Sequence, residues 1–326
     1  MLRLPAFRYL EPRALADALR WKADAGPQGA YVAGGTDLYP NMKRRQQEPT
    51  VVVSLMGVKE LKTAAETTLG GGLTLTQVAD SPAVRRSAPA VAVAAGLVST
   101  PLLRNMGTFG GNLCIDTRCN YYDQGYEWRK AIDFCMKKDG AICWVAPSSP
   151  RCWAVSSSDI APVMVAIAAE YRLVGPSPGG ERVVPAGRFY HNDGINYLTK
   201  QPDEILVDVR LPRANGWDAV YHKLRRRGSF DFPVLGVAAW VRWEGKRVAD
   251  ARVVLGGVAS YPQEVPGAGE ALRGGELTDD RIAAAAQAAY VPSKPLDNTD
   301  FELSWRKQMT RVYVTRALEE LRQRNR

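Results

Sequence analysis

All five cysteines of this 326-residue chain fall in one short segment, between Cys114 and Cys152. Within it, Cys119, Cys135, Cys143 and Cys152 follow one another at intervals of 16, 8 and 9 residues. In a reducing compartment, an odd number of clustered cysteines indicates metal ligation in preference to disulfide bonds. The segment therefore predicts a four-thiolate site on an inserted loop, which usually holds a metal ion or an iron–sulfur cluster.

The spacing of these cysteines does not decide what the site holds. Zinc sites normally contain a short C-x₂₋₄-C pair, and the shortest spacing here, from Cys114 to Cys119, leaves four residues between and stands alone. The cysteine run typical of bacterial ferredoxins is missing as well. The residues alone favour an iron–sulfur cluster, with a zinc ion or unligated buried cysteines as the alternatives.

Charge and apolar patterning restrict the partners and the compartment. The net charge of +9 favours an acidic partner, such as a phosphate-bearing ligand or an acidic electron carrier. Nucleic acid is disfavoured, because the basic residues are dispersed and form no known binding motif. The longest apolar runs, near 89–98 and 160–169, are about ten residues long, half of what a bilayer requires. With no signal-peptide pattern over residues 1–25, we expect a cytoplasmic protein without a membrane segment.

Apolar periodicity and turn residues predict a mixture of helices and strands. Helices are predicted over 11–26 and 81–98. A buried strand is predicted over 50–55, which is β-branched and apolar, and a second strand over 73–78, where apolar and polar residues alternate. Beyond Trp217, strands are followed by helices, which indicates an α+β arrangement for the C-terminal part.

Two glycine-rich segments have the features of phosphate-binding loops. Glycines let the backbone approach a phosphate closely, and successive N–H groups bind anions. Each segment alone is equally typical of a tight turn, and neither matches the Rossmann or P-loop pattern. The pair together predicts a grip on the two phosphates of a dinucleotide. The segments are Ala33-Gly34-Gly35-Thr36-Asp37-Leu38 and Thr108-Phe109-Gly110-Gly111-Asn112-Leu113.

A few other polar residues are candidates for function. Asp159 lies at the predicted start of a helix, where it is either an N-cap or a functional carboxylate. Lys223 precedes a run of arginines and either contacts a flavin or phosphate or is a solvated cation. His191 and His222 have no Ser or Cys partner at a recognisable spacing, so we predict no catalytic triad.

Several short motifs occur in an order and spacing that are specific, although each motif alone is weak. They run nearly from end to end of the chain. Together they resemble the FAD-binding medium subunits of the xanthine dehydrogenase/CO dehydrogenase family of molybdenum hydroxylases. The matching segments are Pro5-Ala6-Phe7, Ala33–Leu38, Arg104–Gly107, Thr108–Leu113, Ser158–Pro162, Pro202–Leu206, Lys223–Asp231 and Leu255–Ala259.

This resemblance implies an α+β fold built from two domains. Residues 1–214 would form a two-lobed FAD-binding domain of the vanillyl-alcohol-oxidase (PCMH) type, with lobes at about 1–57 and 58–214. Residues 215–326 would form a small C-terminal α+β domain. The chain would relay electrons and carry no catalytic residue for the substrate. The residues implied to contact FAD are Ala33, Gly34, Gly35, Thr36, Asp37, Leu38, Asn105, Thr108, Gly110, Gly111, Asn112, Asp159 and Lys223.

The cysteine-bearing segment departs from most members of that family. They have a short connection after the second glycine loop, whereas this chain has about 40 additional residues, at about 114–156. The insertion resembles that of the β subunit of 4-hydroxybenzoyl-CoA reductase, which holds a [4Fe–4S] cluster. The resemblance implies cluster ligation and leaves Cys114 outside the ligand set. The implied ligands are Cys119, Cys135, Cys143 and Cys152.

The same resemblance implies a path for electrons and a set of partners. Reduced ferredoxin would supply electrons to the [4Fe–4S] cluster, and FAD would pass them to a [2Fe–2S] subunit and then to a molybdenum-cofactor subunit. There 4-hydroxybenzoyl-CoA would lose its phenolic hydroxyl. An (αβγ)₂ assembly is implied, and the positive net charge suits an acidic ferredoxin.

Two other interpretations remain open. One is the FAD subunit of a xanthine- or CO-dehydrogenase-like hydroxylase whose insertion is stapled by zinc. The other is a non-enzymatic, zinc-stabilised binding protein, which the two glycine loops disfavour.

Overall fold

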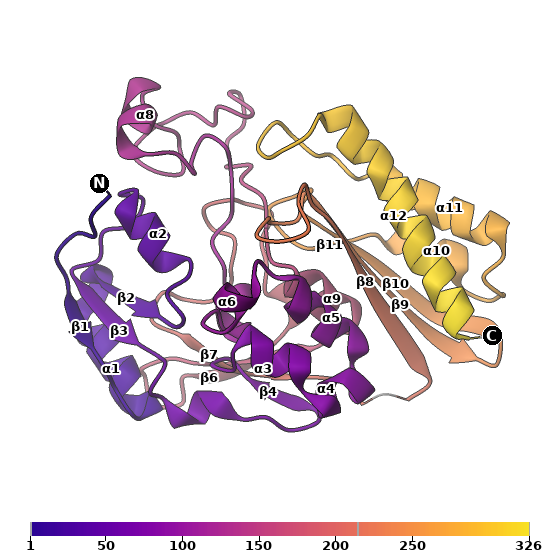
Figure 1. The fold of residues 1–326 in the computed structure, drawn as a ribbon, viewed down its shortest axis with the longest axis horizontal. Helices are drawn as coiled ribbons and strands as arrows, with labels where there is room; N and C mark the ends of the chain where they lie inside the picture. Colours follow the sequence, from indigo (N-terminus) through magenta and orange to yellow (C-terminus); the bar gives the residue numbers. More distant parts are fainter. Residues whose placement is uncertain (1, 214, 326) are drawn as a thin grey trace.

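Three β-sheets and the helices packed on them organise the chain, as the computed structural model shows for residues 2–213 and 215–325 (Figure 1). The first sheet has three parallel strands in the order β1-β3-β2. Helix α1 packs against this sheet through Ala18 and Leu19, and it ends at Gly26, whose φ of 54° suits a glycine. The elements of this part are β1 (Arg8–Leu10), α1 (Leu15–Ala25), β2 (Gly29–Val32), α2 (Leu38–Lys43) and β3 (Val51–Ser54).

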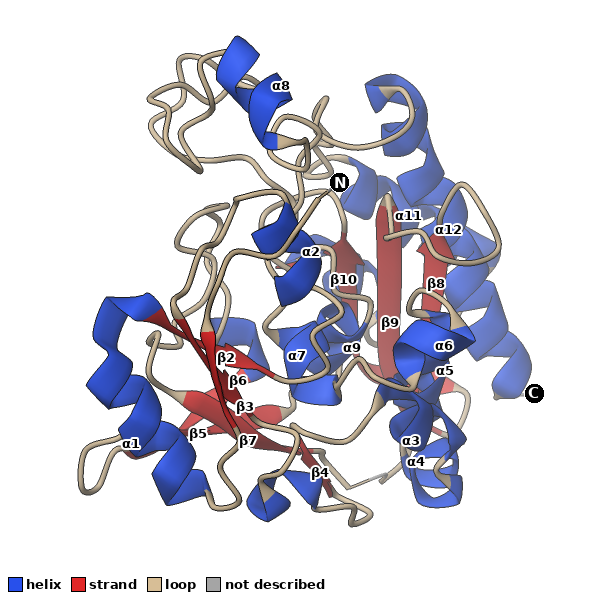
Figure 2. Cartoon of the chain, turned by 60° about the vertical axis from the view of Figure 1, so that its left-hand side comes forward, coloured by secondary structure: helices blue, strands red, loops and turns tan. Residues whose placement is uncertain are grey.

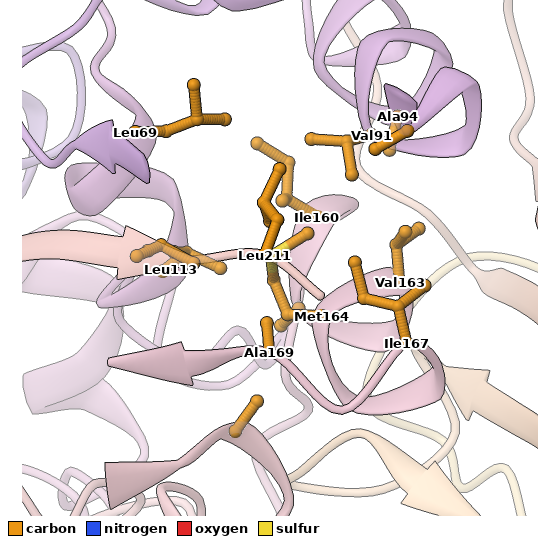
Figure 3. Packing of buried hydrophobic residues seen from close by; sticks show 14 of the residues in the cluster. Leu69, Val91, Ala94, Leu113, Ile160, Val163, Met164, Ile167, Ala169 and Leu211 are labelled. Carbon is orange, nitrogen blue, oxygen red and sulfur yellow. The ribbon is translucent and has the colours of Figure 1, made fainter. Parts of the chain in front are cut away.

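The second sheet is antiparallel, with the strand order β4-β7-β5-β6. Apolar side chains from its strands and from nearby helices form the largest core of the molecule, where Leu69, Val91, Leu113 and Met164 converge (Figure 3). This core fixes helices α7 and α9, which flank the candidate functional site. The elements are β4 (Thr68–Gly70), α3 (Leu75–Asp80), α4 (Pro82–Ser87), α5 (Pro89–Leu97), α6 (Pro101–Arg104), α7 (Phe109–Leu113), α9 (Ile160–Ala166), β5 (Glu170–Val174), β6 (Glu181–Pro185) and β7 (Ile205–Arg210).

The third sheet is also antiparallel, with the order β11-β10-β9-β8. Helices α10, α11 and α12 cover one face of it, and α5 and α9 contact the sheet from the part of the chain that precedes it (Figure 1). Helices α5 and α9 therefore join the second and third sheets into one packed structure. The elements are β8 (Trp217–Leu224), β9 (Leu235–Glu244), β10 (Arg247–Gly256), β11 (Gln263–Glu264), α10 (Pro266–Leu272), α11 (Asp279–Tyr290) and α12 (Leu303–Arg324).

The cysteine-bearing insertion extends away from the three sheets (Figures 1 and 2). It is mostly irregular and includes the short helix α8 (Tyr126–Ala131). Arg118 and Val155 form an antiparallel bridge, so the chain enters and leaves the insertion side by side. Asn298, in the loop before α12, accepts from the backbone N–H of Asn120 at 2.9 Å and donates to the carbonyl of Trp153 at 2.6 Å. The C-terminal part therefore supports the base of the insertion.

Two local predictions are wrong. The segment predicted as a strand over 73–78 forms helix α3, because Thr74 and Gln77 make a reciprocal capping box at 3.1 and 2.8 Å. The helix predicted over 81–98 is two helices, since Ala88 precedes Pro89 and leaves the helical conformation.

The α+β architecture and most of the other elements are confirmed. Helix α1, strand β3 and the succession of strands and helices after Trp217 lie where the sequence predicts them. Among the described residues, no helix is both long and apolar enough to cross a membrane.

Candidate functional site

A cavity of about 880 Å³ lies beside the end of β2 and is bounded by residues from all three sheet regions. Its size is within the range of protein sites that bind small molecules and cofactors. Most of the residues expected to contact FAD line it, and both glycine loops are among them. These are Ala33, Gly34, Gly35, Thr36, Asp37, Leu38, Thr108, Gly110, Gly111, Asn112 and Asp159.

The first glycine loop depends on the absence of side chains at two positions. A Cβ atom at Gly34 would overlap the carbonyl oxygen of Met106 and lie 2.9 Å from the backbone nitrogen of Gly107. Gly35 has a φ of 70°, and a Cβ there would overlap the ring of Tyr39. Since Met106 and Gly107 lead into the second loop, the two glycine loops are in direct backbone contact.

The second glycine loop is held by its own short helix. The hydroxyl of Thr108 accepts from the N–H of Gly111 at 3.1 Å and so caps α7. The side-chain oxygen of Asn112 accepts from the hydroxyl of Ser158 at 2.8 Å. Asn112 therefore ties this loop to the start of α9, in addition to lining the cavity.

Asp159 belongs to a buried polar group between the start of α9 and strand β8. Its carboxylate accepts from Lys223 at 2.8 Å and from the hydroxyl of Tyr221 at 2.9 Å, both on β8. Burial raises the pKa of Asp159 and lowers that of Lys223, and their ion pair opposes both shifts. One interpretation of the sequence made the side chain of Asp159 the cap of α9. That interpretation is wrong, because the hydroxyl of Ser158 accepts from the N–H of Ala161 and the Asp159 side chain makes no capping hydrogen bond.

Two residues of the predicted set do not line the cavity. The ammonium of Lys223 lies behind the wall, paired with Asp159 and donating to the carbonyl of Leu97 at 3.0 Å. Asn105 lies on a separate, smaller surface cavity, where its side chain accepts from the hydroxyl of Thr76 at 2.7 Å.

The four candidate ligand cysteines are buried and lie near one another. Each is at most 7% exposed. Cys119, Cys135 and Cys152 pack together with Tyr122, and Cys143 is close enough to Cys152 to influence its ionisation. Burial raises the pKa of Cys119 to about 12 and that of Cys152 to about 11. None of these four cysteines forms a disulfide, so all four sulfurs are available as ligands.

The thiol group adjoins the cavity through one of its members. Cys119 lines the cavity, whereas Cys135, Cys143 and Cys152 do not. Cys114 also lines the cavity and is apart from the group of four. Over residues 2–213 and 215–325, no three His, Cys, Asp or Glu side chains are arranged to hold a metal ion.

Two buried cations near the cavity and the thiol group could not be predicted from the sequence. Arg118 pairs with Asp37 of the first glycine loop and with Asp123 at 3.3 Å, and its guanidinium lies 4.7 Å from the ring centre of Phe232. Lys137 is the second, and its ammonium donates to the carboxylate of Asp116 at 2.7 Å. Nothing in their local sequence distinguishes them from ordinary surface cations, because their partners are brought together only by the tertiary fold.

Sequence and structure comparisons identify relatives along the whole chain. Residues 5–214 match the family described as the FAD binding domain in molybdopterin dehydrogenase, and residues 219–321 match the CO dehydrogenase flavoprotein C-terminal domain. The chain is 27% identical to the medium chain of carbon monoxide dehydrogenase from Hydrogenophaga pseudoflava, over 96% of each chain. It is 31% identical to the FAD-binding subunit of an Escherichia coli aldehyde oxidoreductase, over 88% of this chain and 89% of the relative. The solved carbon monoxide dehydrogenase from Hydrogenophaga pseudoflava superposes with a TM-score of 0.78 at 25% identity, covering 97% of both chains.

The fold and the cavity define a flavoprotein subunit of an oxidoreductase. The chain belongs to the FAD-binding medium subunits of the xanthine dehydrogenase/CO dehydrogenase family of molybdenum hydroxylases. The family and fold expected from the sequence motifs are therefore confirmed.

Proposed function

We propose that this chain is the electron-transfer subunit of a cytoplasmic, molybdenum-containing reductase of the 4-hydroxybenzoyl-CoA reductase type. It would hold FAD in the cavity and a [4Fe–4S] cluster on the four cysteines of the insertion. When bound, the two groups supply electron transfer from reduced ferredoxin to the [2Fe–2S] and molybdenum subunits of an (αβγ)₂ complex, for reductive dehydroxylation to benzoyl-CoA.

The glycine loops fit the diphosphate of FAD. The backbone at Gly34, Gly35, Gly110 and Gly111 lines the cavity without side chains, so its N–H groups can approach phosphate oxygens closely. Thr36 lies on the same wall, and its hydroxyl could add a further donor. Bound in this way, the dinucleotide would span the contact between the two loops.

The four thiols fit an iron–sulfur cluster by their number, their burial and their chemistry. Each cysteine of a [4Fe–4S] site binds a different iron atom, so the sulfurs of such a site stand further apart than the ligands of a single metal ion. Two of the four, Cys119 and Cys152, are buried thiols with raised pKa values, and such thiols are costly to ionise unless a cation compensates the charge. A cluster of iron atoms would supply that compensation on binding.

One observation carries the proposal: Cys119 belongs both to the thiol group and to the wall of the cavity. A redox centre on the four cysteines would therefore adjoin a flavin in the cavity, with no other domain between them. The positive net charge, +9 over the whole chain, supports an acidic donor such as ferredoxin.

The test is anaerobic purification of this chain without its partner subunits, followed by iron, acid-labile sulfide, zinc and flavin analysis of the same sample. About four iron and four sulfide per chain, together with one FAD, are expected. One zinc without iron, with FAD present, would instead identify the flavin subunit of a xanthine- or CO-dehydrogenase-like hydroxylase with a zinc-stapled insertion. Reduction of 4-hydroxybenzoyl-CoA by the complex and reduced ferredoxin then tests the substrate and the donor.

A further inference from the structure

Lys137 is a buried cation in the insertion, only two residues beyond Cys135 in the chain. Its side chain is 6% exposed. The ammonium donates to three oxygens: the carboxylate of Asp116 at 2.7 Å, the hydroxyl of Thr117 at 2.6 Å and the carbonyl of Gly194 at 2.6 Å. All three hydrogens of the ammonium therefore have partners, and its position is fixed.

Several contacts connect this cation to the thiol group. Gly194, whose carbonyl binds Lys137, packs so closely on Cys152 that a Cβ atom there would lie 2.7 Å from the sulfur. The N–H of Gly194 donates to the carbonyl of Cys152 at 3.0 Å. The ammonium also lies 4.9 Å from the ring centre of Tyr122, which packs with Cys119, Cys135 and Cys152.

The same cation also adjoins the cavity. Its partner Asp116 lines the cavity, and so does Tyr197, whose ring centre is 5.3 Å from the ammonium. Lys137 therefore lies behind two lining residues of the cavity, Asp116 and Tyr197, on the side of the thiol group. A charge in this position acts on both sites through a medium of low polarity, where screening is weak.

A purely structural role does not require a charge here. Replacing a buried ion pair by apolar residues of similar volume is often neutral or stabilising, so the pair is weak evidence for stability alone. Four thiolates, in contrast, bring concentrated negative charge to a buried site, and each added electron increases it. A fixed cation beside them stabilises the more negative state.

We propose that Lys137 is a positioning residue whose fixed charge raises the reduction potential of the centre on the four cysteines, with Asp116 partly neutralising that charge. This inference rests on the proposed function, because it requires a redox centre on those cysteines. It predicts opposite effects for the two partners: removing the cation lowers the potential, and removing the anion raises it.

The experiment is a redox titration of the purified complex, monitored by electron paramagnetic resonance, for the wild type and for Lys137→Met, Lys137→Arg and Asp116→Asn. We expect Lys137→Met to shift the oxidised-to-reduced ratio of the cluster at least tenfold toward the oxidised form, which corresponds to about 59 mV for one electron. Lys137→Arg keeps the charge and should titrate close to the wild type. Asp116→Asn should shift the ratio toward the reduced form.

The outcomes separate the two proposals. If the wild-type complex shows no [4Fe–4S] signal apart from those of the [2Fe–2S] subunit, the proposed function fails and this inference fails with it. If the wild type contains the cluster and Lys137→Met titrates at the wild-type potential, the inference alone is overturned. If Lys137→Met does not retain its cluster, Asp116→Asn decides: a shift toward the reduced form supports the inference, and an unchanged or opposite potential overturns it.

Discussion

Gly34 and Met106, 72 residues apart in the chain, are in backbone contact, and any side chain at Gly34 would occupy the position of the Met106 carbonyl oxygen. This contact brings the first glycine loop against the residues that lead into the second one. The two loops can therefore act on a single diphosphate only while position 34 has no Cβ atom.

Gly34→Ala is expected to weaken FAD binding at least tenfold. The loops must move apart to admit the new methyl group, and the backbone N–H groups on the two sides then lose their common ligand. Bound flavin per chain, measured by absorbance after desalting, is the readout. Gly125→Ala is a matched control, because a Cβ at Gly125 meets nothing within 4 Å. Full flavin content in Gly34→Ala would show that the loop contact is dispensable for FAD.

Cys135→Ser is expected to remove the cluster and leave FAD bound. Cys135 belongs to the thiol group and does not line the cavity. Iron per chain should fall from about four to below one, since the cluster would lose one of its four thiolate ligands. Cys114→Ser is the control, because Cys114 is apart from the group and its loss should leave the iron content unchanged. If FAD leaves together with the cluster in Cys135→Ser, the insertion is a structural part of the flavin site.

Lys223→Met is expected to destabilise the protein by about 3–5 kcal/mol, because it leaves Asp159 buried without its ion pair. The double variant Asp159→Asn/Lys223→Met should recover part of this loss, since it strands no charge. Urea unfolding of the two variants and the wild type measures the free energies. Equal destabilisation by the single and double variants would show that loss of packing, and not the unpaired charge, is the cause.

The same single variant should have a distinctive pH dependence. Burial already raises the pKa of Asp159 with Lys223 present, and loss of the cation raises it further. The folded state then binds a proton that the unfolded state releases above about pH 3.9. The contribution of Asp159 to the stability of Lys223→Met is therefore fully present below that pH, and it is lost as the pH rises through the folded pKa of Asp159. The double variant lacks this carboxylate, so an equal decline in its unfolding free energy would contradict the assignment.

How much of this site is predictable depends on the range of the interactions involved. The glycine loops and the thiol group could be found in the sequence, because glycine and cysteine are chosen for chemistry that few other residues supply. Lys137 and Asp116 could not, since they are 21 residues apart in an irregular loop and meet only through the fold. The sequence predicts Lys223 as a residue of the site, but it cannot show that Lys223 pairs with Asp159 behind the cavity wall.

The errors in the fold have a similar origin. Alternation over 73–78 indicates a strand, but the capping box of Thr74 and Gln77 outweighs it, and the apolar residues Leu75 and Val78 then share one face of a helix. The insertion has no periodicity from which its conformation could be derived. Its shape depends on contacts with residues distant in the sequence. Asn298, for example, hydrogen-bonds to the backbone of Asn120 near the start of the insertion and of Trp153 near its end.

Asn298→Ala is expected to loosen the insertion from the C-terminal part and to destabilise the protein by about 1–3 kcal/mol. The carbonyl of Trp153 loses its donor at 2.6 Å, and a partly buried acceptor that loses its partner lowers stability. The backbone contact with Asn120 remains, so the loss should be local. Faster proteolysis within residues 114–156, at unchanged flavin content, is the expected result. Asn325→Ala is the control, because Asn325 makes one exposed hydrogen bond, to Gly245 at 3.1 Å. An insertion that resists protease equally in both variants would mean that the thiol group and the Arg118–Val155 bridge hold it without this contact.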